Sequence, residues 1–384
     1  MHLLMLGLDS SLLGDPHGNT VTRHVEYAER IGQISVIVYN AASDPKTVTR
    51  LSDRLIVYPT NVRTPYLFPW AAYRLGVRIH RRQRADLITT QDPFATGLIG
   101  LWLKWRLRLP LNAQSHSHFF ENPDWVAERP LRNRVLQAIG NFVVKRADSL
   151  RVLSEREKAI CVRRGLDPRR ITVLAAPTNV GSFAPPVPPE RLGALRAALG
   201  IAPDAPVLLW VGFPSPAKNV DLLLEAFARV RQRYPAARLV MAGDFSQRPN
   251  FRQRAEAQSV IFPGLVSYTD LPAYYQLAEV YVHSSRYEGI ARVLMEALAA
   301  GTPVASTAHL GADEVVRPGE TGLLTDHTPD ALAGAVIALL DDPARARAMG
   351  EAGQRDVLER FDYERQLDRV VQTYRDTLHL AGRG

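Results

Sequence analysis

Residues His283 to Val304, HSSRYEGIARVLMEALAAGTPV, hold the pattern that decides the fold. The apolar residues just before them predict the end of a buried strand, and Gly289 then breaks the pattern ahead of a helix expected from about Ala291 to Ala300. Gly301 and Pro303 end that helix and open the next strand. A strand, a turn and a helix in this order are typical of a parallel α/β sheet.

Two carboxylates flank the start of this helix, Glu288 before it and Glu296 inside it. Gly289 lets a ligand approach the backbone closely. The first N–H groups of the helix, at the positive end of its dipole, suit a phosphate. They belong to Ile290, Ala291 and Arg292. The alternative interpretation is an amphipathic helix with a solvated glutamate at each end, the more common arrangement for either carboxylate alone.

The composition is that of a globular enzyme with more than one core. A chain of 384 residues predicts two domains. The single cysteine, Cys161, excludes an internal disulfide and a cysteine cluster for zinc. No apolar run is long enough to span a membrane, and the N-terminus lacks the features of a signal peptide. We therefore expect a cytoplasmic protein.

Positive charge is concentrated in the first half of the chain. Residues 1–178 contain 26 Lys and Arg against 15 Asp and Glu, a net charge of +11. The densest patches run from Arg74 to Arg84 and from Arg129 to Arg170, and Trp102 and Trp105 flank Lys104. Such a face suits anionic lipid head groups, a phosphorylated acceptor or nucleic acid, and suggests peripheral contact with the inner face of the cell membrane. The alternative is a solubilising surface.

Strands and helices alternate in two series. The first begins with the apolar run HLLMLGL, a long loop from Asp9 to Thr20, a helix and the strand ISVIVY, which predict a parallel sheet whose ligands bind at the carboxyl ends of its strands. That loop lacks G-x-G-x-x-G, and no Walker-type P-loop sequence occurs. Further strands are expected at Leu55–Pro59, Asp86–Thr90, Leu111–His116 and Asp148–Ser154.

The second series follows a proline-rich segment, Pro185–Pro189, which is the best linker candidate. Its strands are expected at Val207–Gly212, Arg238–Gly243, Val260–Gly264, Pro303–Thr307 and Thr321–Thr325. The pattern predicts two doubly wound, Rossmann-like α/β domains, residues 1–184 and 185–360, with their glycine-containing loops facing a common cleft. An amphipathic helix is expected within residues 361–384.

Basic side chains stand near two of the strand ends. Lys218, in the loop Gly212–Asn219, is well placed to neutralise a diphosphate, although a solvent-exposed lysine at a helix start is as common. His116 and His118 follow another strand, but a metal site there lacks an evident third ligand. A histidine lining a cleft is the better interpretation of His116. No Asp-x-Asp pair occurs in the chain.

The run EGIARVLME resembles the E-x7-E motif of retaining glycosyltransferases with the two-domain GT-B fold, and most closely the large family numbered four. Other pieces match that family's pattern in the same order, so the resemblance spans nearly the whole chain. They include HGNTVTRHV, DLITTQDPFATGLIG, RADSLRVLSE, VLLWVGFPSPAKNVDLLLEAF, VIFPGLV and HLGADEVVRPGETGLL.

The resemblance implies a role for each candidate residue of the second domain. Glu296 is expected to hold the ribose hydroxyls of a nucleotide, and Glu288 to face the donor sugar together with the backbone amides that follow it. Lys218, next to Gly212, is expected to bind the diphosphate, which needs positive charge and N–H donors but no metal or other cofactor. The base is expected near Pro263–Val266, which includes Gly264 and Leu265.

From the first domain, the resemblance implies that Gly18 and Asn19 approach the diphosphate and sugar, and that His116 lies against the donor sugar. This domain is expected to bind the acceptor, and the final helix to cross back to it. Two positions depart from the family pattern: Phe213 replaces an arginine that many relatives carry, and Gly181 replaces an aspartate.

The sequence therefore predicts a retaining, metal-independent glycosyltransferase that takes a sugar from a UDP- or GDP-sugar donor and passes it to an acceptor, such as a lipid- or glycan-linked one. A non-catalytic nucleotide-sugar binding module is the alternative that Phe213 and Gly181 motivate. Nucleic-acid binding rests only on the charge of the first half and is disfavoured.

Overall fold

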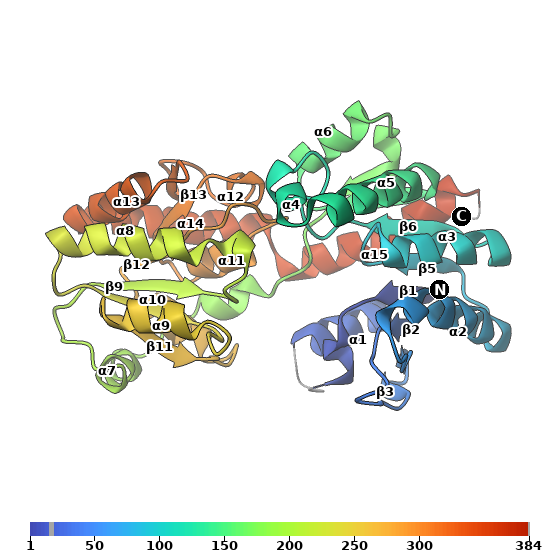
Figure 1. The fold of residues 1–384 in the computed structure, drawn as a ribbon, viewed down its shortest axis with the longest axis horizontal. Coiled ribbons are helices and arrows are strands. Elements are labelled where there is room, and N and C mark those ends of the chain that lie inside the picture. Colours follow the sequence, from blue (N-terminus) through green and yellow to red (C-terminus); the bar gives the residue numbers. More distant parts are fainter. Residues whose placement is uncertain (15–18, 383–384) are drawn as a thin grey trace. The chain divides into compact units, whose positions relative to one another are not determined.

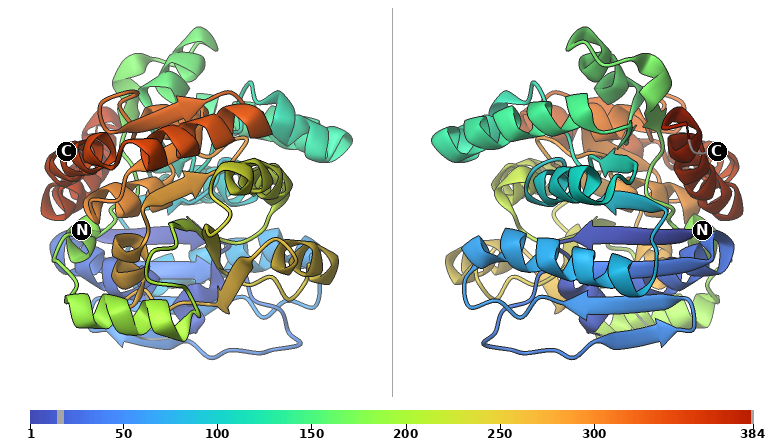
Figure 2. Two further views of the ribbon diagram at one scale, coloured as in Figure 1. Left: turned by 90° about the vertical axis from the view of Figure 1, so that its left-hand side faces the viewer. Right: turned by 90° about the vertical axis from the view of Figure 1, so that its right-hand side faces the viewer.

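The computed structural model describes residues 1–14 and 19–382. The chain divides into two compact units, which Figures 1 and 2 show as ribbons. The first contains Met1–Pro177 together with Glu364–Gly384, and the second contains Thr178–Tyr363. The sequence placed this division at residue 184, so the observed division comes earlier in the chain.

The proline-rich segment does not separate the units. Residues Pro185–Pro189 lie inside the second unit, where the side chain of Gln276 accepts a hydrogen bond from Val187 N at 2.8 Å and donates one to Pro185 O at 2.8 Å. The linker prediction was therefore wrong, because an amide side chain from a distant helix satisfies backbone groups that the composition alone suggested would be free.

The first unit is built on an eight-stranded sheet in the order β3-β4-β2-β1-β5-β6-β7-β8. All neighbours are parallel except β3 and β4, and the antiparallel edge strand β3 was not anticipated. The strands are β1 His2–Gly7, β2 Gln33–Val38, β3 Thr49–Ser52, β4 Leu55–Pro59, β5 Leu87–Thr90, β6 Leu111–Gln114, β7 Ser149–Val152 and β8 Ile171–Val173. The α-helices are α1 Asn19–Ile31, α2 Phe68–Arg82, α3 Ala95–Leu107, α4 Pro123–Glu128, α5 Pro130–Arg146, α6 Glu155–Arg163 and α15 Tyr363–Leu380.

The final helix, α15, belongs to the first unit although it follows the second in sequence. Its buried face carries polar anchors as well as apolar residues. Gln114 Nε2 donates a hydrogen bond to Tyr374 Oη at 3.2 Å, and the hydroxyls of Ser149 and Thr377 are 2.6 Å apart. Helix α15 therefore completes the side of the first sheet near β6 and β7, as the expected crossing back requires.

The second unit contains a six-stranded parallel sheet in the order β11-β10-β9-β12-β13-β14. Its strands are β9 Val207–Val211, β10 Arg238–Ala242, β11 Val260–Gly264, β12 Val280–His283, β13 Val304–Thr307 and β14 Gly322–Thr325. Its α-helices are α7 Pro189–Ala198, α8 Val220–Arg233, α9 Pro249–Glu256, α10 Leu271–Leu277, α11 Arg292–Ala299, α12 Leu310–Asp313, α13 Pro329–Asp341 and α14 Pro343–Arg360. Short 3-10 helices occur at Ser10–Leu13, Pro65–Leu67, Pro168–Arg170, Val180–Phe183 and Pro216–Lys218.

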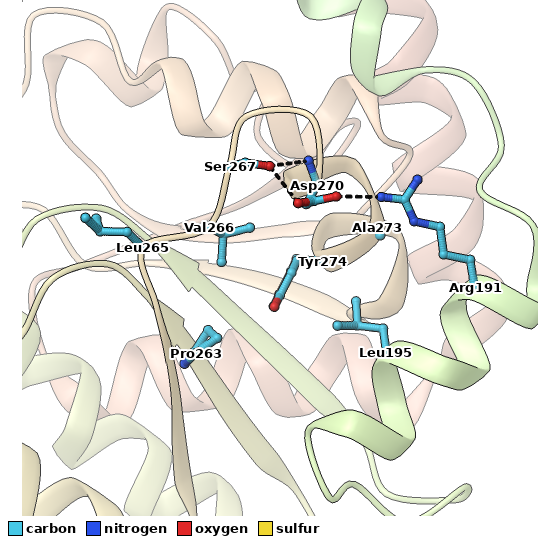
Figure 3. A pocket seen from close by; sticks show the side chains of 9 residues that line it. All are labelled: Arg191, Leu195, Pro263, Leu265, Val266, Ser267, Asp270, Ala273 and Tyr274. Atoms are coloured by element: carbon cyan, nitrogen blue, oxygen red, sulfur yellow. Dashed lines mark hydrogen bonds and ion pairs between the residues drawn. The ribbon is translucent and has the colours of Figure 1, made fainter. Parts of the chain in front are cut away.

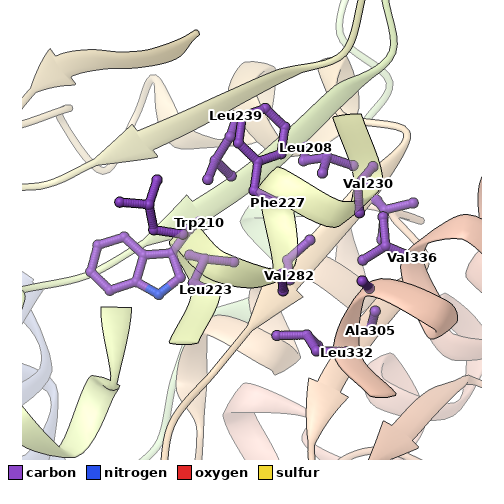
Figure 4. Packing of buried hydrophobic residues seen from close by; sticks show 14 of the residues in the cluster. Leu208, Trp210, Leu223, Phe227, Val230, Leu239, Val282, Ala305, Leu332 and Val336 are labelled. Atoms are coloured by element: carbon purple, nitrogen blue, oxygen red, sulfur yellow. The ribbon is translucent and has the colours of Figure 1, made fainter. Parts of the chain in front are cut away.

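Alternating residues of the second sheet pack into two separate cores. On one face, Trp210 and Val282 meet α8 and α13, and Figure 4 shows this cluster. On the other face, Leu209 and Tyr281 pack with α10 and α11. Strands that are buried on both faces explain the continuous apolar runs of the sequence. The predicted doubly wound α/β architecture is confirmed for each unit.

Among the described residues, no helix is both long and apolar enough to cross a lipid bilayer.

Candidate functional site

The carboxyl ends of β9, β10 and β11 meet so closely that glycine is needed there. A Cβ atom on Gly243 would lie 1.9 Å from Gly212 O. The amide of Gly212 donates to Ala242 O at 3.0 Å, and that of Gly243 donates to Gly264 O at 2.9 Å. Gly212 and Gly264, both predicted as site residues, therefore shape this edge of the sheet.

The loop after β12 is fixed to the loop that carries Lys218. Ser284 Oγ donates a hydrogen bond to Lys218 O at 2.8 Å, and Arg286 N donates to Ala217 O at 2.7 Å. On the other side, Thr307 Oγ1, at the end of β13, donates to Ser285 O at 2.7 Å. Residues 283–288 are thus held between two neighbouring strand ends.

This arrangement brings Lys218 to Glu288. Lys218 Nζ and Ser285 Oγ each donate a hydrogen bond to Glu288 Oε1 at 2.7 Å. Burial acts to raise the pKa of the Glu288 carboxyl, but the imidazole of His283 and the ammonium group of Lys218 outweigh it and hold the pKa well below its usual value of 4.5. Glu288 is therefore a carboxylate with positive charge beside it. Sequence reasoning placed both residues in the site without expecting them to pair.

Two buried histidines adjoin Glu288. His283 Nε2 lies 2.8 Å from Glu288 Oε1, and the rings of His283 and His309 have centroids 5.4 Å apart. Burial lowers the pKa of His283, and it lowers that of His309 to about 3, so the His309 imidazole is neutral at pH 7. Neither histidine was assigned a role from the sequence. His283 ends β12, and His309 follows β13, the adjacent parallel strand. The position of both histidines at the carboxyl ends of adjacent strands is the signal that could have paired them.

Glu296 has different surroundings from Glu288. Its side chain is buried, and Oε2 accepts a hydrogen bond from Tyr275 Oη at 3.0 Å. Burial raises the pKa of the Glu296 carboxyl to about 7, against the lowering effects of Arg292 and Tyr275. The two glutamates of the motif therefore differ in ionisation at neutral pH.

Helix α11, which follows Glu288 and contains Glu296, begins at Arg292, within one residue of the predicted start. Arg292 N donates to Ile290 O at 3.1 Å, so a phosphate at this helix start would have to share or replace that hydrogen bond. A Cβ on Gly311 would lie 3.1 Å from Glu288 O, which shows that the segment 309–313 packs directly on residues 288–290. Gly289, Ile290 and Ala291 therefore form a loop held from both sides.

A pocket of about 270 Å³ lies beside the segment predicted to bind the base. It is lined by Pro263, Leu265 and Val266 from the end of β11 and by Tyr274 of α10, whose ring is seen in Figure 3. At its rim, Arg191 donates to Asp270 at 2.8 Å. Leu265 is exposed, in keeping with a surface that is free to meet a ligand.

The site residues that the sequence predicted in the first half of the chain belong to the first unit. His116 is exposed just after β6, and Asn19 begins α1, whereas Gly18 is outside the described residues. Ser115, the residue before His116, donates a hydrogen bond to Glu157 Oε1 at 2.6 Å and so positions the loop that carries His116. His118 is buried, and it is not part of the histidine–carboxylate group described above.

The two departures from the family pattern are both in the second unit. Phe213 follows Gly212 and has 66% of its surface exposed, and Gly181 lies in the 3-10 helix Val180–Phe183. Neither position supplies charge to the neighbourhood of Lys218.

Comparison with solved structures defines the class of fold. Sucrose-phosphate synthase from Thermosynechococcus elongatus matches with a TM-score of 0.82 and 23% identity, over 98% of this chain and 99% of that one. Anabaena HepE in complex with UDP-glucose matches with a TM-score of 0.77 and 19% identity, over 97% and 99%. These similarities, with the two doubly wound sheets, define a GT-B fold.

Sequence comparison defines the family. Residues 193–356 match the family "Glycosyl transferases group 1", and residues 24–177 match "Glycosyl transferase 4-like domain". A D-inositol 3-phosphate glycosyltransferase from Kineococcus radiotolerans is 31% identical over 320 residues, which cover 77% of this chain and 72% of that protein. The chain belongs to the group 1 glycosyltransferase family.

The names of two further relatives include a lipid. An alpha-monoglucosyldiacylglycerol synthase from Streptococcus pneumoniae is 27% identical over 71% of this chain and 63% of that protein. A GDP-mannose-dependent alpha-(1-6)-phosphatidylinositol monomannoside mannosyltransferase from Mycolicibacterium smegmatis is 32% identical over 50% of this chain and 52% of that protein. The chain thus matches these relatives over 63% and 52% of their length.

Proposed function

We propose that this protein is a retaining, metal-independent glycosyltransferase that transfers a sugar from a UDP- or GDP-sugar to an acceptor. The observation that carries the proposal is the contact of Lys218 with Glu288 at the carboxyl edge of the second sheet. Glu296 lies in the helix that follows Glu288. Family membership supports it, as do relatives whose names include a GDP-mannose-dependent enzyme and a structure that contains UDP-glucose.

Each residue of this group has a part in binding the donor. The Lys218 ammonium binds the diphosphate, Glu296 accepts hydrogen bonds from the ribose hydroxyls, and Glu288 accepts from the sugar hydroxyls. Because Lys218 is already bonded to Glu288 at 2.7 Å, a diphosphate must share or replace that contact. The positive charge that neutralises the leaving group thus comes from side chains and amides, and this is why no metal is needed.

The transfer occurs on one face of the sugar. The bond from the anomeric carbon to the diphosphate oxygen breaks, the acceptor oxygen forms its bond on the same side, and the acceptor's proton passes to the departing phosphate. No carboxylate nucleophile is required in this route. His116, exposed after β6 of the first unit, is assigned to the sugar and to the positive charge that develops on it.

The first unit binds the acceptor, and helix α2 offers the surface for one attached to an anionic lipid. A groove of about 500 Å³ beside α2 is lined by Arg63, Arg74 and Arg78. Trp70, 59% exposed, stands next to them, and the Arg74 guanidinium lies 5.9 Å from its ring. Exposed aromatic and arginine side chains together are typical of surfaces that meet lipid head groups.

The patch around Lys104 suits this role less well than the sequence suggested. Lys104 Nζ is 2.6 Å from Asp148 Oδ2 and also donates to Arg146 O, so its charge is already paired. Trp102 and Trp105 remain partly exposed on α3.

Thermal-shift measurements test the donor site. UDP, GDP, ADP and their sugars are added separately, with and without EDTA, and the melting temperature is followed. A shift with one base and its sugar, unchanged by EDTA, is the expected result. If no nucleotide shifts the melting temperature, the donor assignment fails. A shift without turnover would favour the non-catalytic binding module.

Sedimentation with liposomes tests the α2 surface. Vesicles with anionic lipid at low salt should carry the protein down, and vesicles of neutral lipid should not. Trp70→Ala with Arg74→Gln should reduce the bound fraction more than Trp105→Ala with Lys104→Gln. Equal loss in both pairs would contradict the assignment to α2.

A further inference from the structure

Three potential metal ligands converge beside the Lys218–Glu288 pair. His283 ends β12, His309 immediately precedes α12, and Glu288 lies in the loop before α11. A ligand atom from each of the three lies within 4.8 Å of the other two. They come from two neighbouring strand ends, so the sheet itself, rather than a single loop, fixes their spacing.

The imidazoles of this group have unused bonding capacity. His283 has no exposed surface, and His309 has only 7% of its surface exposed. Within the described residues, neither ring nitrogen of either histidine makes a hydrogen bond. His283 Nε2 is close to Glu288 Oε1, at 2.8 Å, but not aligned for one. Buried polar atoms are rarely left in this state, because losing water without gaining a partner is unfavourable.

We propose that His283, Glu288 and His309 form a binding site for a divalent cation of the zinc class. Two imidazole nitrogens and one carboxylate oxygen are a donor set that zinc accepts with a water molecule as its fourth ligand. Magnesium and calcium prefer oxygen ligands throughout and are expected to bind poorly.

The geometry needs only a small adjustment. Zinc holds nitrogen and oxygen ligands at about 2.0–2.2 Å, which places tetrahedral ligand atoms roughly 3.3 Å apart. The pair from His283 and Glu288, at 2.8 Å, already lies inside that separation. The nitrogen of His309 lies within 4.8 Å of both, so a short approach of this nitrogen completes the set.

Lys218 is the competitor of this cation. Its ammonium group is 2.7 Å from the carboxylate oxygen that the metal would use, so a bound cation displaces it. Glu288 is also the residue assigned to the donor sugar. The cation is therefore an inhibitor that competes with the donor rather than a cofactor, and this second part rests on the proposed function.

Metal binding is measured on the EDTA-treated, dialysed full chain by calorimetric titration with ZnCl2. Absorption of bound Co2+ gives a second readout that reports tetrahedral ligands. One equivalent of Zn2+ is expected to bind, and His309→Ala should weaken it by at least about 10-fold. His327→Ala is the matched control, because this exposed histidine lies close by, with Nε2 2.7 Å from Ala308 O. It should bind as the wild type does.

A gain of affinity provides an independent check. Lys218→Met removes the competing positive charge and should tighten Zn2+ binding by roughly 10-fold, while it weakens nucleotide binding. Circular dichroism confirms that the variants fold. The inference is overturned if the wild type binds no Zn2+, if His309→Ala binds it as the wild type does, or if Lys218→Met weakens it.

Inhibition is tested separately from binding. Zn2+ should raise the apparent KM for the nucleotide sugar without changing kcat, and EDTA should restore the rate. If no nucleotide shifts the melting temperature but Zn2+ still binds through His309, the proposed function fails and the metal site stands. If nucleotides bind and Zn2+ does not, the metal site fails alone.

Discussion

The two glutamates at the start of α11 lie eight positions apart in one motif, yet they have opposite surroundings. Glu288 meets Lys218, Ser285 and His283, and its pKa is held well below 4.5. Glu296 meets a tyrosine hydroxyl in an otherwise buried position, and its pKa is raised to about 7. The first carboxylate is charged before any ligand arrives, whereas the second is near its midpoint at neutral pH.

The difference shows what each residue contributes to a donor site. A charged carboxylate paired with a lysine is stable without ligand and keeps the lysine in place. A half-ionised carboxylate is costly without ligand, and hydroxyl donors relieve that cost by stabilising its charged form. The motif thus combines one preorganised group with one that a ligand completes.

The largest effect is expected from removing the positive charge of Lys218, which pairs with Glu288. Lys218→Met should lower the affinity for the nucleoside diphosphate by roughly 10- to 100-fold, because a hydrogen bond to a charged group contributes about 1.5–3 kcal/mol. Calorimetry with UDP and GDP measures it. Lys145→Met, at an exposed position of the first unit, is the control. Equal affinities in the two variants would remove Lys218 from the diphosphate site.

The two carboxylates should respond to amide substitution with opposite signs. At pH 8 without ligand, Glu288→Gln should lower the free energy of unfolding by about 1–3 kcal/mol, since it leaves the ammonium group of Lys218 without a charged partner. Glu296→Gln should raise it by roughly 1–3 kcal/mol, since it removes a buried charge. Thermal unfolding of both variants measures these changes. A loss of stability in both would mean that the two sites do not differ as described.

Stability should also depend on pH through Glu296. Its pKa is about 7 in the folded protein and close to 4.5 when unfolded, so its contribution is fully present below pH 4.5 and is lost as pH rises through 7. Burial raises the pKa of Glu157 in the first unit to about 7 as well, so it acts in the same direction. Melting temperatures between pH 5 and 8 should fall less steeply in Glu296→Gln and Glu157→Gln. A profile unchanged by either substitution would contradict these pKa shifts.

The smallest effect is expected at Tyr275. Tyr275→Phe removes the hydrogen bond that stabilises the ionised form of Glu296, and the affinity for nucleotide at pH 7 should fall by about 2- to 10-fold, as for a single hydrogen bond. The deficit should shrink at pH 8.5, where the carboxylate is ionised in any case. A deficit of the same size at both pH values would assign Tyr275 a role independent of Glu296.

Much of the fold was readable from the sequence because parallel strands buried on both faces form continuous apolar runs. Strands β4 and β11, although only partly buried, also have the predicted bounds. The edge strand β3 was missed, because its half-exposed residues Thr49–Ser52 show no such run. The prediction of a linker at Pro185–Pro189 was wrong, because composition does not show that the side chain of Gln276 makes hydrogen bonds to this segment.

For the candidate site, the sequence supplied the positions of Lys218, Glu288 and Glu296 and the turn between strand and helix. These are local properties: a glycine after a strand, a helix start and a charged side chain at a strand end. Only the tertiary structure decided which groups meet. Ion pairing between Lys218 and Glu288, and the approach of His283 to His309, depend on the register of β9, β12 and β13. The pKa values depend on burial and on partners far away in sequence, so they follow from packing and not from the motif.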